Sequence, residues 1–370
     1  MNPQPYSGDL SPAGPRAVDT SRDPVVIFWE LTRSCALACR HCRAEAQPKR
    51  HPLELSTEEC RSVMRSLTRF DRPPIVVLSG GDPFMRRDLF EIVELGVGLG
   101  LTVSVSPSAT ALARGWRLRK LAELGVSRVS FSLDGPTPEA HDTFRGFPGT
   151  FERTIEMFRT AREAGLSFQV NTTVTARTRG FLPRMADLVA AEGAAVWDLF
   201  FLVPTGRGQA ADLISAEEHE NVFNWIADHR SEWPFTVKTT LGMHYRRVAA
   251  ERQLRANRID PSALDADAVR SLWPGPVTND GQGIFFISHT GQMQPSGFLP
   301  LTAGNVRRDD VVKMYRDSRL FRSLRDPSLL KGKCGRCPFN RICGGCRARA
   351  FAVTGDPFAA EPCCVYTAES

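Results

Sequence analysis

The sequence predicts an α/β fold: an open partial (β/α)6 barrel followed by a small C-terminal domain rich in cysteine. Short β-rich runs alternate with longer amphipathic runs from residue 25 to about residue 204, a pattern typical of a parallel sheet with right-handed helical crossovers. The chain has six such strand–helix units, which are too few for a closed eight-stranded barrel. Six of the ten cysteines crowd between residues 334 and 364, so the chain ends in a unit of different chemistry.

The expected strands are short runs rich in β-branched and aromatic residues. They are Val25–Glu30, Ile75–Ser79, Thr102–Ser106, Arg128–Leu133, Phe168–Thr173 and Trp197–Val203. The expected helices have apolar residues at helical spacing. They are Thr57–Phe70, Arg87–Leu99, Leu112–Leu124, Phe151–Ala164 and Leu182–Glu192. Ser56 offers the first helix an N-cap, and four helices are followed by a residue suited to a left-handed C-terminal turn, namely Gly100, Gly125, Gly165 and Gly193.

The alternation of expected strands and helices becomes irregular after residue 208. Ala216–His229 predicts a helix, and Lys238–Gly283 is expected to be a polar, Arg-rich connection. Ile284–Ser288 and Met293–Ser296 flank a turn and predict a hairpin, and a helix is expected over Asp309–Leu324.

Four regions follow from these patterns. We expect a disordered leader at 1–24, the barrel core at 25–208, a helical and linker region at 209–282 and the cysteine-rich domain at 283–370. The net charge of +6 comes without a block of like charges, which argues against a nucleic-acid partner. The leader lacks the apolar stretch of a secretory signal, and no segment approaches the roughly 20 apolar residues of a membrane helix. We therefore expect a cytoplasmic protein without a membrane partner.

Cys35, Cys39 and Cys42 form a C-x3-C-x2-C arrangement directly after the first expected strand. Thiolates are the soft ligands that iron–sulfur clusters require. Three cysteines for four irons leave one iron open to a substrate or cofactor, which a four-cysteine electron-carrying site does not offer. The alternative is a structural zinc site, which needs a fourth ligand such as His41.

The second expected strand ends in Ser79-Gly80-Gly81-Asp82-Pro83, whose paired glycines let a ligand approach the backbone closely. The triad, this turn and the strand–helix units together resemble the radical S-adenosylmethionine (radical SAM) superfamily over half of the chain. In that family the open iron of a [4Fe–4S] cluster binds the methionyl amino and carboxylate groups of S-adenosylmethionine. The reduced cluster cleaves this cofactor to methionine and a 5'-deoxyadenosyl radical, which abstracts hydrogen from the substrate.

The resemblance implies cofactor contacts for residues near the cysteine triad. Gly80, Gly81 and Asp82 would hold the methionyl amino group, although many members have Glu where this chain has Asp. His41 stands where members often carry an aromatic residue, and it would lie near the adenine.

The resemblance also extends to residues after the later strands. Ser132 and Asp134 match family positions near the ribose and the methionyl group. Arg145 could pair with the cofactor carboxylate, and Asn171 could reach the ribose hydroxyls. The alternatives are that Asp134 caps a helix and that Arg145 is a surface residue.

The tail contains the spacing Cys334-x2-Cys337-x5-Cys343-x2-Cys346, followed by Cys363 and Cys364. It resembles the tail of the SPASM group of radical SAM enzymes, which carries auxiliary iron–sulfur clusters. The resemblance implies one auxiliary [4Fe–4S] cluster, ligated by Cys334, Cys337, Cys343 and Cys364, with Cys363 as the alternative to the last. Zinc is the other interpretation, because four thiolates suit it as well.

A complete second auxiliary cluster is not expected. The hairpin has Ser296 where the SPASM group places a cysteine, and no cysteine lies between positions 61 and 333. A second cluster would need Cys346, Cys363 or a different ligand such as His244. The isolated Cys60 is expected to be a packed apolar residue.

Three runs resemble the haem-maturation branch of this group: Cys39–Glu45, Gly344–Ala350 and Val353–Asp356. That branch includes the decarboxylase that converts iron-coproporphyrin III to haem, and an enzyme that acts on propionates during denitrification-haem synthesis. Propionates are anionic, and several arginines are compatible with them, namely Arg207, Arg246, Arg247, Arg347 and Arg349. His244 and Tyr245 are candidates to line the substrate cavity, with packed roles as the alternative.

The resemblance therefore implies an enzyme that cleaves S-adenosylmethionine for the oxidative decarboxylation or modification of tetrapyrrole propionates. Flavodoxin or ferredoxin would reduce the triad cluster, and the auxiliary cluster would accept an electron or bind the substrate. One rival is a radical maturase of a ribosomally made peptide, although a leader of about 24 residues is too short for a peptide-recognition domain. The other is an iron–sulfur electron carrier, against which the open iron argues. No catalytic residue beyond the cluster ligands can be named from the sequence.

Overall fold

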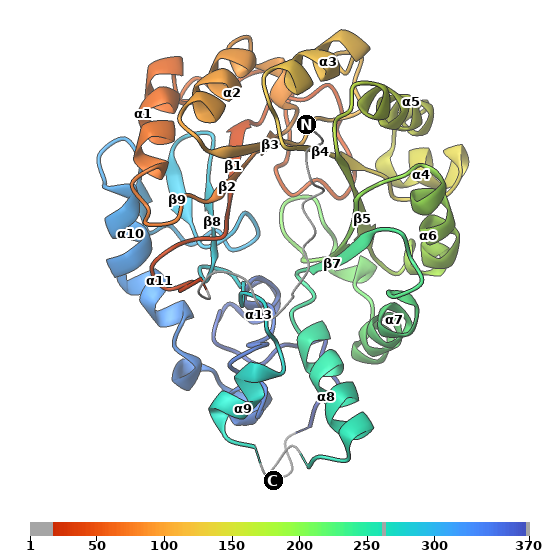
Figure 1. Ribbon diagram of the computed structural model, residues 1–370, viewed down its shortest axis with the longest axis vertical. Coiled ribbons are helices and arrows are strands. Elements are labelled where there is room, and N and C mark those ends of the chain that lie inside the picture. The colour runs from red at the N-terminus through yellow and green to blue at the C-terminus, as the bar shows by residue number, and fades with distance from the viewer. Residues whose placement is uncertain (1–17, 261–263, 368–370) are drawn as a thin grey trace.

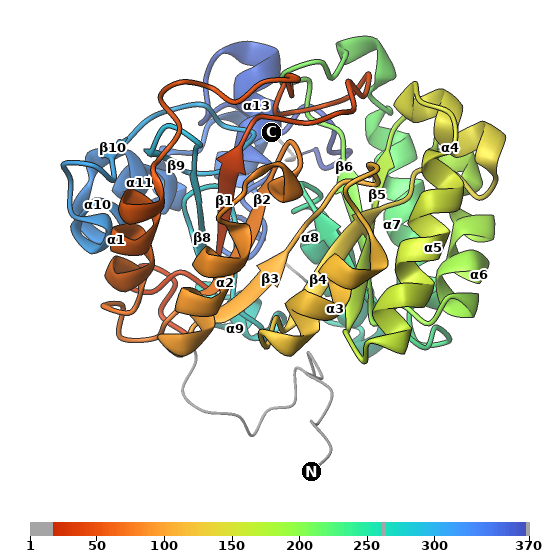
Figure 2. The same cartoon turned by 90° about the horizontal axis from the view of Figure 1, so that it is seen from above.

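The computed structural model describes residues 18–260 and 264–367. Within these residues the strands form one sheet in the order β10-β9-β8-β1-β2-β3-β4-β5-β6-β7. The strands from β1 to β7 pair in parallel along the chain, and β8 pairs in parallel with β1. The sheet curves into an open barrel with helices on its outer face (Figures 1 and 2), which confirms the predicted fold class.

The six strands predicted from the β-rich runs are all present, and their ends differ from the prediction by at most two residues. They are β1 (Val26–Thr32), β2 (Ile75–Gly80), β3 (Thr102–Val105), β4 (Arg128–Ser132), β5 (Phe168–Val174) and β6 (Val196–Phe201). Alternate strand residues such as Ile27, Trp29 and Leu31 are buried with the helices in the main core. The residues between them face the inside of the barrel, because successive side chains point to opposite faces of a sheet.

The predicted helices are also present: α1 (Thr57–Leu67), α2 (Leu89–Gly98), α3 (Gly115–Glu123), α5 (Thr150–Glu163), α6 (Leu182–Ala191) and α7 (Ala216–His229). The Ser56 side chain accepts a hydrogen bond from the Glu59 amide, and the Glu59 carboxylate accepts one from the Ser56 amide, a capping box that fixes the start of α1. Cys60 is fully buried in this helix, as expected. The short helix α4 (Pro138–Arg145) was not predicted.

The expected polar connection over residues 238–283 contains regular secondary structure that the sequence did not indicate. It contains part of β7 (Thr236–Thr240), which extends the parallel sheet next to β6, and the helices α8 (Tyr245–Asn257) and α9 (Ala266–Ser271). Helix α8 lacks a broad apolar face because arginines occupy much of it. Arg247 on α8 pairs with Glu251 one turn along the same helix and with Glu220 on α7, so ion pairs replace the apolar periodicity that would have revealed the helix.

The predicted hairpin is formed by β8 (Ile284–Ile287) and β9 (Gln292–Gln294), with β10 (Gly304–Asn305) at the edge. Because β8 pairs with β1, the hairpin continues the barrel sheet. The helix expected after it breaks at Ser318 into α10 (Val311–Asp317) and α11 (Arg319–Leu324), and the Ser318 side chain caps the second. The cysteine-rich tail contains α12 (Gly332–Arg336) and α13 (Arg347–Thr354).

Most of the expected leader, residues 1–17, lies outside the described residues. Residues 18–24 pack on the body of the protein. The Tyr315 hydroxyl donates to the Thr20 carbonyl over 2.6 Å, and Arg325 donates to the Ser21 carbonyl over 2.8 Å. The end of the expected leader therefore belongs to the fold.

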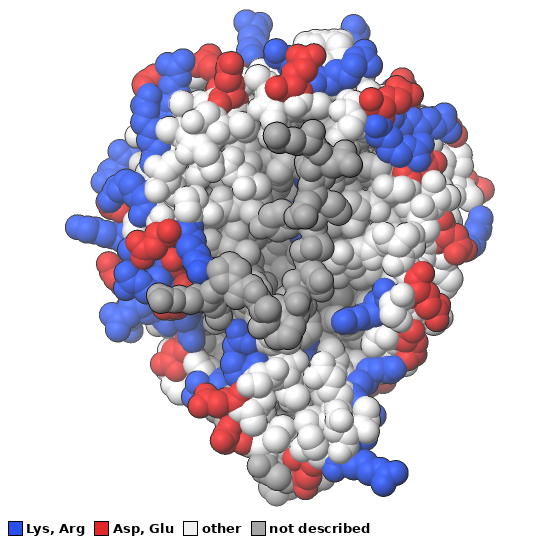
Figure 3. Space-filling model, viewed as in Figure 1, with Lys and Arg blue, Asp and Glu red and all other residues white. Residues whose placement is uncertain are grey.

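Surface charge shows no single-sign face in the view down the barrel. Basic and acidic side chains are interspersed around the rim (Figure 3). No helix among the described residues is long and apolar enough to span a bilayer.

Candidate functional site

The three cysteines of the triad lie in the loop that leaves β1. Cys35 and Cys39 are buried, and both pack with Leu37 and Ala46 in a small apolar cluster. The Leu37 amide donates to Cys35 Sγ over 3.3 Å. Burial raises the pKa of the Cys35 thiol to about 11, so a metal must displace its proton to bind the thiolate.

The loop after β6 clamps the cysteine loop. Arg207 donates from Nε to the Cys39 carbonyl over 2.8 Å and from Nη1 to the Ala46 carbonyl over 3.2 Å. Gly206 has a φ of +61°, and a Cβ atom there would lie 2.4 Å from the Arg43 carbonyl oxygen. From the sequence, Arg207 is compatible with an anionic substrate; in the structure its contacts hold the backbone of the ligand loop.

The paired glycines at the end of β2 allow the chain there to pack on the start of the cysteine loop. A Cβ at Gly80 would lie 2.2 Å from the Thr32 carbonyl oxygen, and one at Gly81 would lie 2.5 Å from that of Ser34. The Gly81 amide donates to the Thr32 carbonyl over 2.8 Å. Both positions therefore exclude any side chain because of a close backbone approach.

Asp82, predicted to contact the methionyl amino group, is fully buried. Its Oδ2 accepts from the Thr110 hydroxyl over 2.7 Å, and its Oδ1 accepts from the Phe84 amide over 3.1 Å. Burial raises the pKa of the Asp82 carboxyl. These contacts tie the glycine turn to the loop after β3, a role that the sequence did not indicate.

Asp134 and Arg145 meet beside the cysteine loop. Arg145 donates from Nη1 to Asp134 Oδ2 over 2.7 Å, and Asp134 Oδ1 accepts from the Thr173 amide. Burial alone would raise the pKa of Asp134, but the charge of Arg145 holds it below its usual value. The Cys39 sulfur and Asp134 raise the pKa of Arg145 despite its burial, so this arginine lies between a predicted ligand and a carboxylate. It is not a surface residue.

His41 lies flat against Phe144, with ring centroids 4.3 Å apart and planes inclined by 26°. Its Nε2 is 3.8 Å from Asp134 Oδ2. Burial lowers the pKa of His41 to about 4, so the ring is neutral near pH 7. It can therefore offer a ligand the same flat face as an aromatic residue.

A small cavity borders the cysteine loop. Its lining includes Ser108, Ser132 and Arg145, and the Ser108 hydroxyl lies 3.8 Å from Cys35 Sγ. Ser132 pairs in register with Asn171 on β5, whose side-chain oxygen accepts from Gln169. The structure thus brings Ser132 and Arg145 to the triad and places Asn171 one strand further along.

The row of paired residues continues across the inside of the barrel. Asn171 pairs with Asp198 on β6, and Asp198 pairs with Lys238 on β7. Lys238 is exposed to solvent. Desolvation by the surrounding barrel nevertheless lowers the pKa of Lys238, as does the charge of Arg128, while the charge of Asp198 opposes this shift. Sequence reasoning missed this cation because β7 fell in the expected connection.

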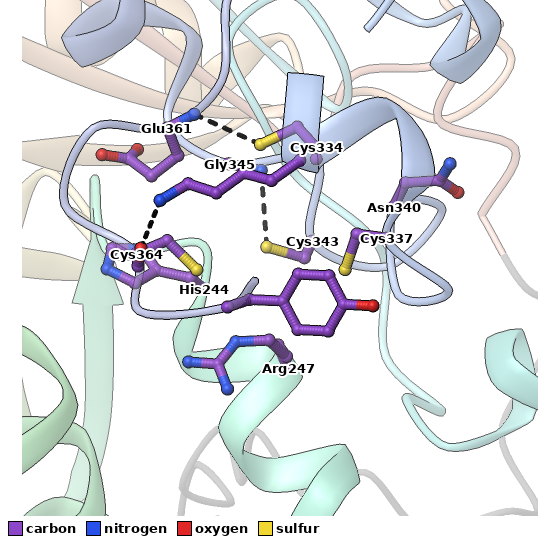
Figure 4. A pocket seen from close by; sticks show the side chains of 12 residues that line it. His244, Arg247, Cys334, Cys337, Asn340, Cys343, Gly345, Glu361 and Cys364 are labelled. Atoms are coloured by element: carbon purple, nitrogen blue, oxygen red, sulfur yellow. Dashed lines mark hydrogen bonds between the residues drawn. The ribbon is translucent and has the colours of Figure 1, made fainter. Parts of the chain in front are cut away.

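The tail cysteines surround a second pocket. Cys334, Cys337, Cys343 and Cys364 all line it, and Figure 4 shows their side chains around one space together with His244 and Arg247. The structure therefore brings together the four cysteines that the SPASM resemblance implies.

The other two tail cysteines lie outside the pocket lining. Cys346 Sγ accepts from the Arg349 amide at the start of α13 over 3.3 Å, and Cys363 Sγ lies 3.8 Å from the Ile214 carbonyl oxygen. Ser296, at the position of the missing hairpin cysteine, is buried. His244, considered as a ligand for a second cluster or as part of a substrate cavity, lines the pocket with the other four cysteines. The neighbouring Tyr245 is buried in the main core.

Backbone and side-chain N–H groups point at the pocket sulfurs. The Glu361 amide donates to Cys334 Sγ over 3.2 Å, and the Gly345 amide donates to Cys343 Sγ over 3.4 Å. Arg347 Nη2 lies 3.7 Å from Cys334 Sγ. Such donors stabilise negative charge on thiolates. Burial has the opposite effect, and it raises the pKa of the neighbouring Cys337 thiol to about 12.

In residues 18–260 and 264–367, no group of three or more His, Cys, Asp and Glu side chains converges closely enough to hold one metal ion. Zinc needs its ligands around a single point. The thiolates of a four-iron cube each bind a different iron and stand apart around its corners.

The tail arginines that were considered for the substrate form hydrogen bonds within the protein. Arg347 donates to the carbonyls of Pro357 and Ala359, and the fully buried Arg349 donates to those of Leu202 and Leu241. Arg246 similarly donates to the carbonyls of Ile342 and Thr278. Arg347 and Arg349, which the sequence alone left compatible with propionates, therefore bind main-chain carbonyls, and Arg347 also approaches a cysteine of the tail pocket.

The chain is similar to known proteins. A family model described as the radical SAM superfamily matches residues 29–188. The chain is 42% identical over 344 residues to the "AdoMet-dependent heme synthase" of Oleidesulfovibrio alaskensis, covering 92% of this chain and 87% of that protein. It is 30% identical over 377 residues to the "Pre-heme d1 synthase" of Dinoroseobacter shibae, covering 96% and 90%. Among solved structures, SuiB of Streptococcus suis bound to S-adenosylmethionine matches with a TM-score of 0.72 at 16% identity, over 93% of this chain and 78% of that chain.

Proposed function

The chain belongs to the radical SAM superfamily, and from this premise we propose that it decarboxylates the propionates of iron-coproporphyrin III to form haem. Enzymes of this superfamily bind a [4Fe–4S] cluster and S-adenosylmethionine. The observation that carries the proposal is the identity of 42% over nearly the whole chain to a protein named as a haem synthase. The lower identity of 30% to the pre-haem d1 synthase favours the first activity over the second.

The residues beside the triad fit the cofactor. Cys35, Cys39 and Cys42 would hold the cluster, whose bound form supplies the electron that cleaves S-adenosylmethionine and yields the hydrogen-abstracting radical. The neutral His41 ring would stack near the adenine, and Arg145, held by Asp134, would face the cofactor carboxylate. The loops around the cysteines bury Cys35 and Cys39 almost fully, whereas Cys42 is partly exposed.

Each decarboxylation balances as follows. One hydrogen atom would leave the propionate β-carbon for the radical that the bound cofactor supplies, the bond to the carboxylate carbon would break, and carbon dioxide and a vinyl group would form. One electron per propionate is left and needs an acceptor. The pocket of Cys334, Cys337, Cys343 and Cys364 offers the site for an auxiliary [4Fe–4S] cluster that would take it.

The inside of the barrel is the proposed substrate site. Ser132, Asn171, Asp198 and Lys238 form one cross-strand row, so Lys238 lies three strand spacings, or about 14 Å, from Ser132 at the cofactor end. A substrate propionate would meet the ammonium group of Lys238 near Arg128. We further propose a cytoplasmic location and flavodoxin or ferredoxin as the electron donor.

The experiment compares anaerobically purified wild-type protein with a Cys35→Ala, Cys39→Ala, Cys42→Ala variant. The expected wild-type content is about eight irons per chain, and the variant should lose about four, as two [4Fe–4S] clusters require. Reduced wild-type protein should form 5'-deoxyadenosine, stimulated by iron-coproporphyrin III and accompanied by carbon dioxide release.

The possible outcomes separate the parts of the proposal. Formation of 5'-deoxyadenosine without stimulation by the porphyrin would overturn the substrate assignment and point to the rival peptide substrate. Zinc in place of iron, together with no 5'-deoxyadenosine, would overturn the assigned chemistry altogether.

A further inference from the structure

The tail pocket contains polar nitrogen atoms that the described residues leave without hydrogen-bond partners. His244 is fully buried, and within the described chain neither Nδ1 nor Nε2 has a partner. Arg247 is 3% exposed, and its Nε likewise has no partner among the described residues. Buried polar groups are almost always hydrogen-bonded, so these three nitrogens indicate that another group occupies the pocket.

Both residues face the same space. His244 directly precedes α8 and Arg247 lies one turn later, a spacing that puts side chains on one helix face. Both line the pocket with Cys337 and Cys364, and Figure 4 shows His244 next to Cys364, with Arg247 on the same side of the space.

Their neighbours hold these side chains in place. Arg247 donates from Nη1 to Glu251 over 2.7 Å and from Nη2 to Glu220, and Nε is the guanidinium nitrogen left without a partner among the described residues. The His244 ring packs edge-on against Phe223, with centroids 4.6 Å apart, and lies 5.2 Å from the His219 ring. Neither residue can turn easily towards another partner because aromatic rings and ion pairs fix both.

We propose that His244 and Arg247 donate N–H hydrogen bonds to sulfur atoms of the auxiliary cluster and thereby raise its reduction potential. This inference rests on the auxiliary cluster of the proposed function. A neutral imidazole has one N–H donor, and the Arg247 Nε–H is a second. Reduction adds negative charge to the cluster, so donors to its sulfurs stabilise the reduced form more than the oxidised one. A less negative potential suits a cluster that takes up the electron left by decarboxylation.

The test uses the Cys35→Ala, Cys39→Ala, Cys42→Ala protein, in which the auxiliary cluster is the only one expected. Into this parent we would introduce His244→Phe, which removes the donor but keeps a flat ring, and His244→Gln, which restores an N–H group. The matched control is His219→Phe, because His219 is also buried and borders His244 but does not line the pocket. Iron content and the midpoint potential from an electron paramagnetic resonance titration are measured for each protein.

The expected result is about four irons in every protein, a more negative midpoint potential in His244→Phe, a partial return in His244→Gln and no shift in the control. An unchanged potential in His244→Phe with full iron content would overturn the proposal, as would an equal shift in the control. Loss of iron in His244→Phe alone would also overturn it, because His244 would then be needed to hold the cluster. If the parent protein itself binds no iron, the assignment of an auxiliary cluster is wrong. This result is independent of the porphyrin assay that tests the proposed function.

Discussion

Asp134 and Arg145 form a buried ion pair in which Nη1 and Oδ2 are 2.7 Å apart and the two residues are 11 positions apart in the chain. The pair joins the loop after β4 to the end of α4. It also places the Arg145 guanidinium near Cys39, where an anionic group of the cofactor would bind. The carboxylate therefore acts as a positioning residue for the arginine.

We expect Asp134→Asn to weaken both folding and cofactor binding. Breaking a buried ion pair by removing one partner costs about 3 kcal/mol of stability or more, and Arg145 loses the contact that orients it. The free energy of unfolding and the dissociation constant of S-adenosylmethionine measure these effects. The matched control is Asp212→Asn, which removes a pair with the largely exposed Arg177 and should cost less than about 1 kcal/mol. Equal effects of the two substitutions would contradict the assigned role.

Gly81→Ala should abolish 5'-deoxyadenosine formation. The added methyl group would lie 2.5 Å from the Ser34 carbonyl oxygen and 2.7 Å from that of Arg33, so the cysteine loop would have to move. Gly98→Ala is the control, because a Cβ at this end of α2 meets nothing within 4 Å, and alanine favours the helix by up to about 1 kcal/mol. A Gly81→Ala protein with wild-type turnover would show that the close approach is not required.

The tail cysteines should divide into two classes in iron analysis. Single replacements of Cys334, Cys337 or Cys343 by Ala should remove about four irons per chain, because each deletes a ligand of one [4Fe–4S] cluster. Cys346→Ala should retain the iron, since Cys346 Sγ accepts from a backbone amide outside the pocket lining. Iron loss on replacement of Cys346 would indicate a further cluster of mixed ligands.

The sequence predicts those features whose determinants are local. The strands from β1 to β6 can be recognised in the sequence as β-branched runs. The cysteine triad can be recognised because cluster ligands within one loop have a fixed spacing. Helix α8 cannot be recognised in the sequence, because it is stabilised in part by the ion pair of Arg247 with Glu220 on another helix rather than by an apolar face.

Contacts between distant segments explain what the sequence could not reveal in the site. Arg207 holds the Cys39 carbonyl although the two are 168 positions apart, and no local pattern distinguishes it from a substrate-binding arginine. Lys238 joins the row of Ser132 and Asn171 only through the register of neighbouring strands, which is a tertiary property.

Stability should fall below pH 6.5 because buried histidines stay neutral in the folded protein. Burial lowers the pKa of His141 from 6.5 to about 4. Between these values the unfolded chain binds a proton that the folded chain does not, so the free energy of unfolding decreases as the pH falls. From pH 6.5 to 5.5, His141 accounts for a loss of about 1 kcal/mol. Urea unfolding at both pH values should show a smaller loss in His141→Gln than in the wild type, and equal losses would contradict a neutral His141.

Lys238→Met should weaken the use of iron-coproporphyrin III without affecting the binding of S-adenosylmethionine. Lys238 lies on the inner face of β7, across the barrel from the cysteine loop, and the residue is exposed. Loss of a hydrogen bond to a charged partner costs about 1.5 to 3 kcal/mol, so kcat/KM should fall about tenfold or more, mainly through KM. Lys313→Met on the outer helix α10 removes the same charge from an exposed site and should leave kcat/KM unchanged. If both substitutions lower kcat/KM equally, net charge rather than a contact inside the barrel attracts the substrate. If neither lowers kcat/KM, the propionate binds elsewhere in the barrel.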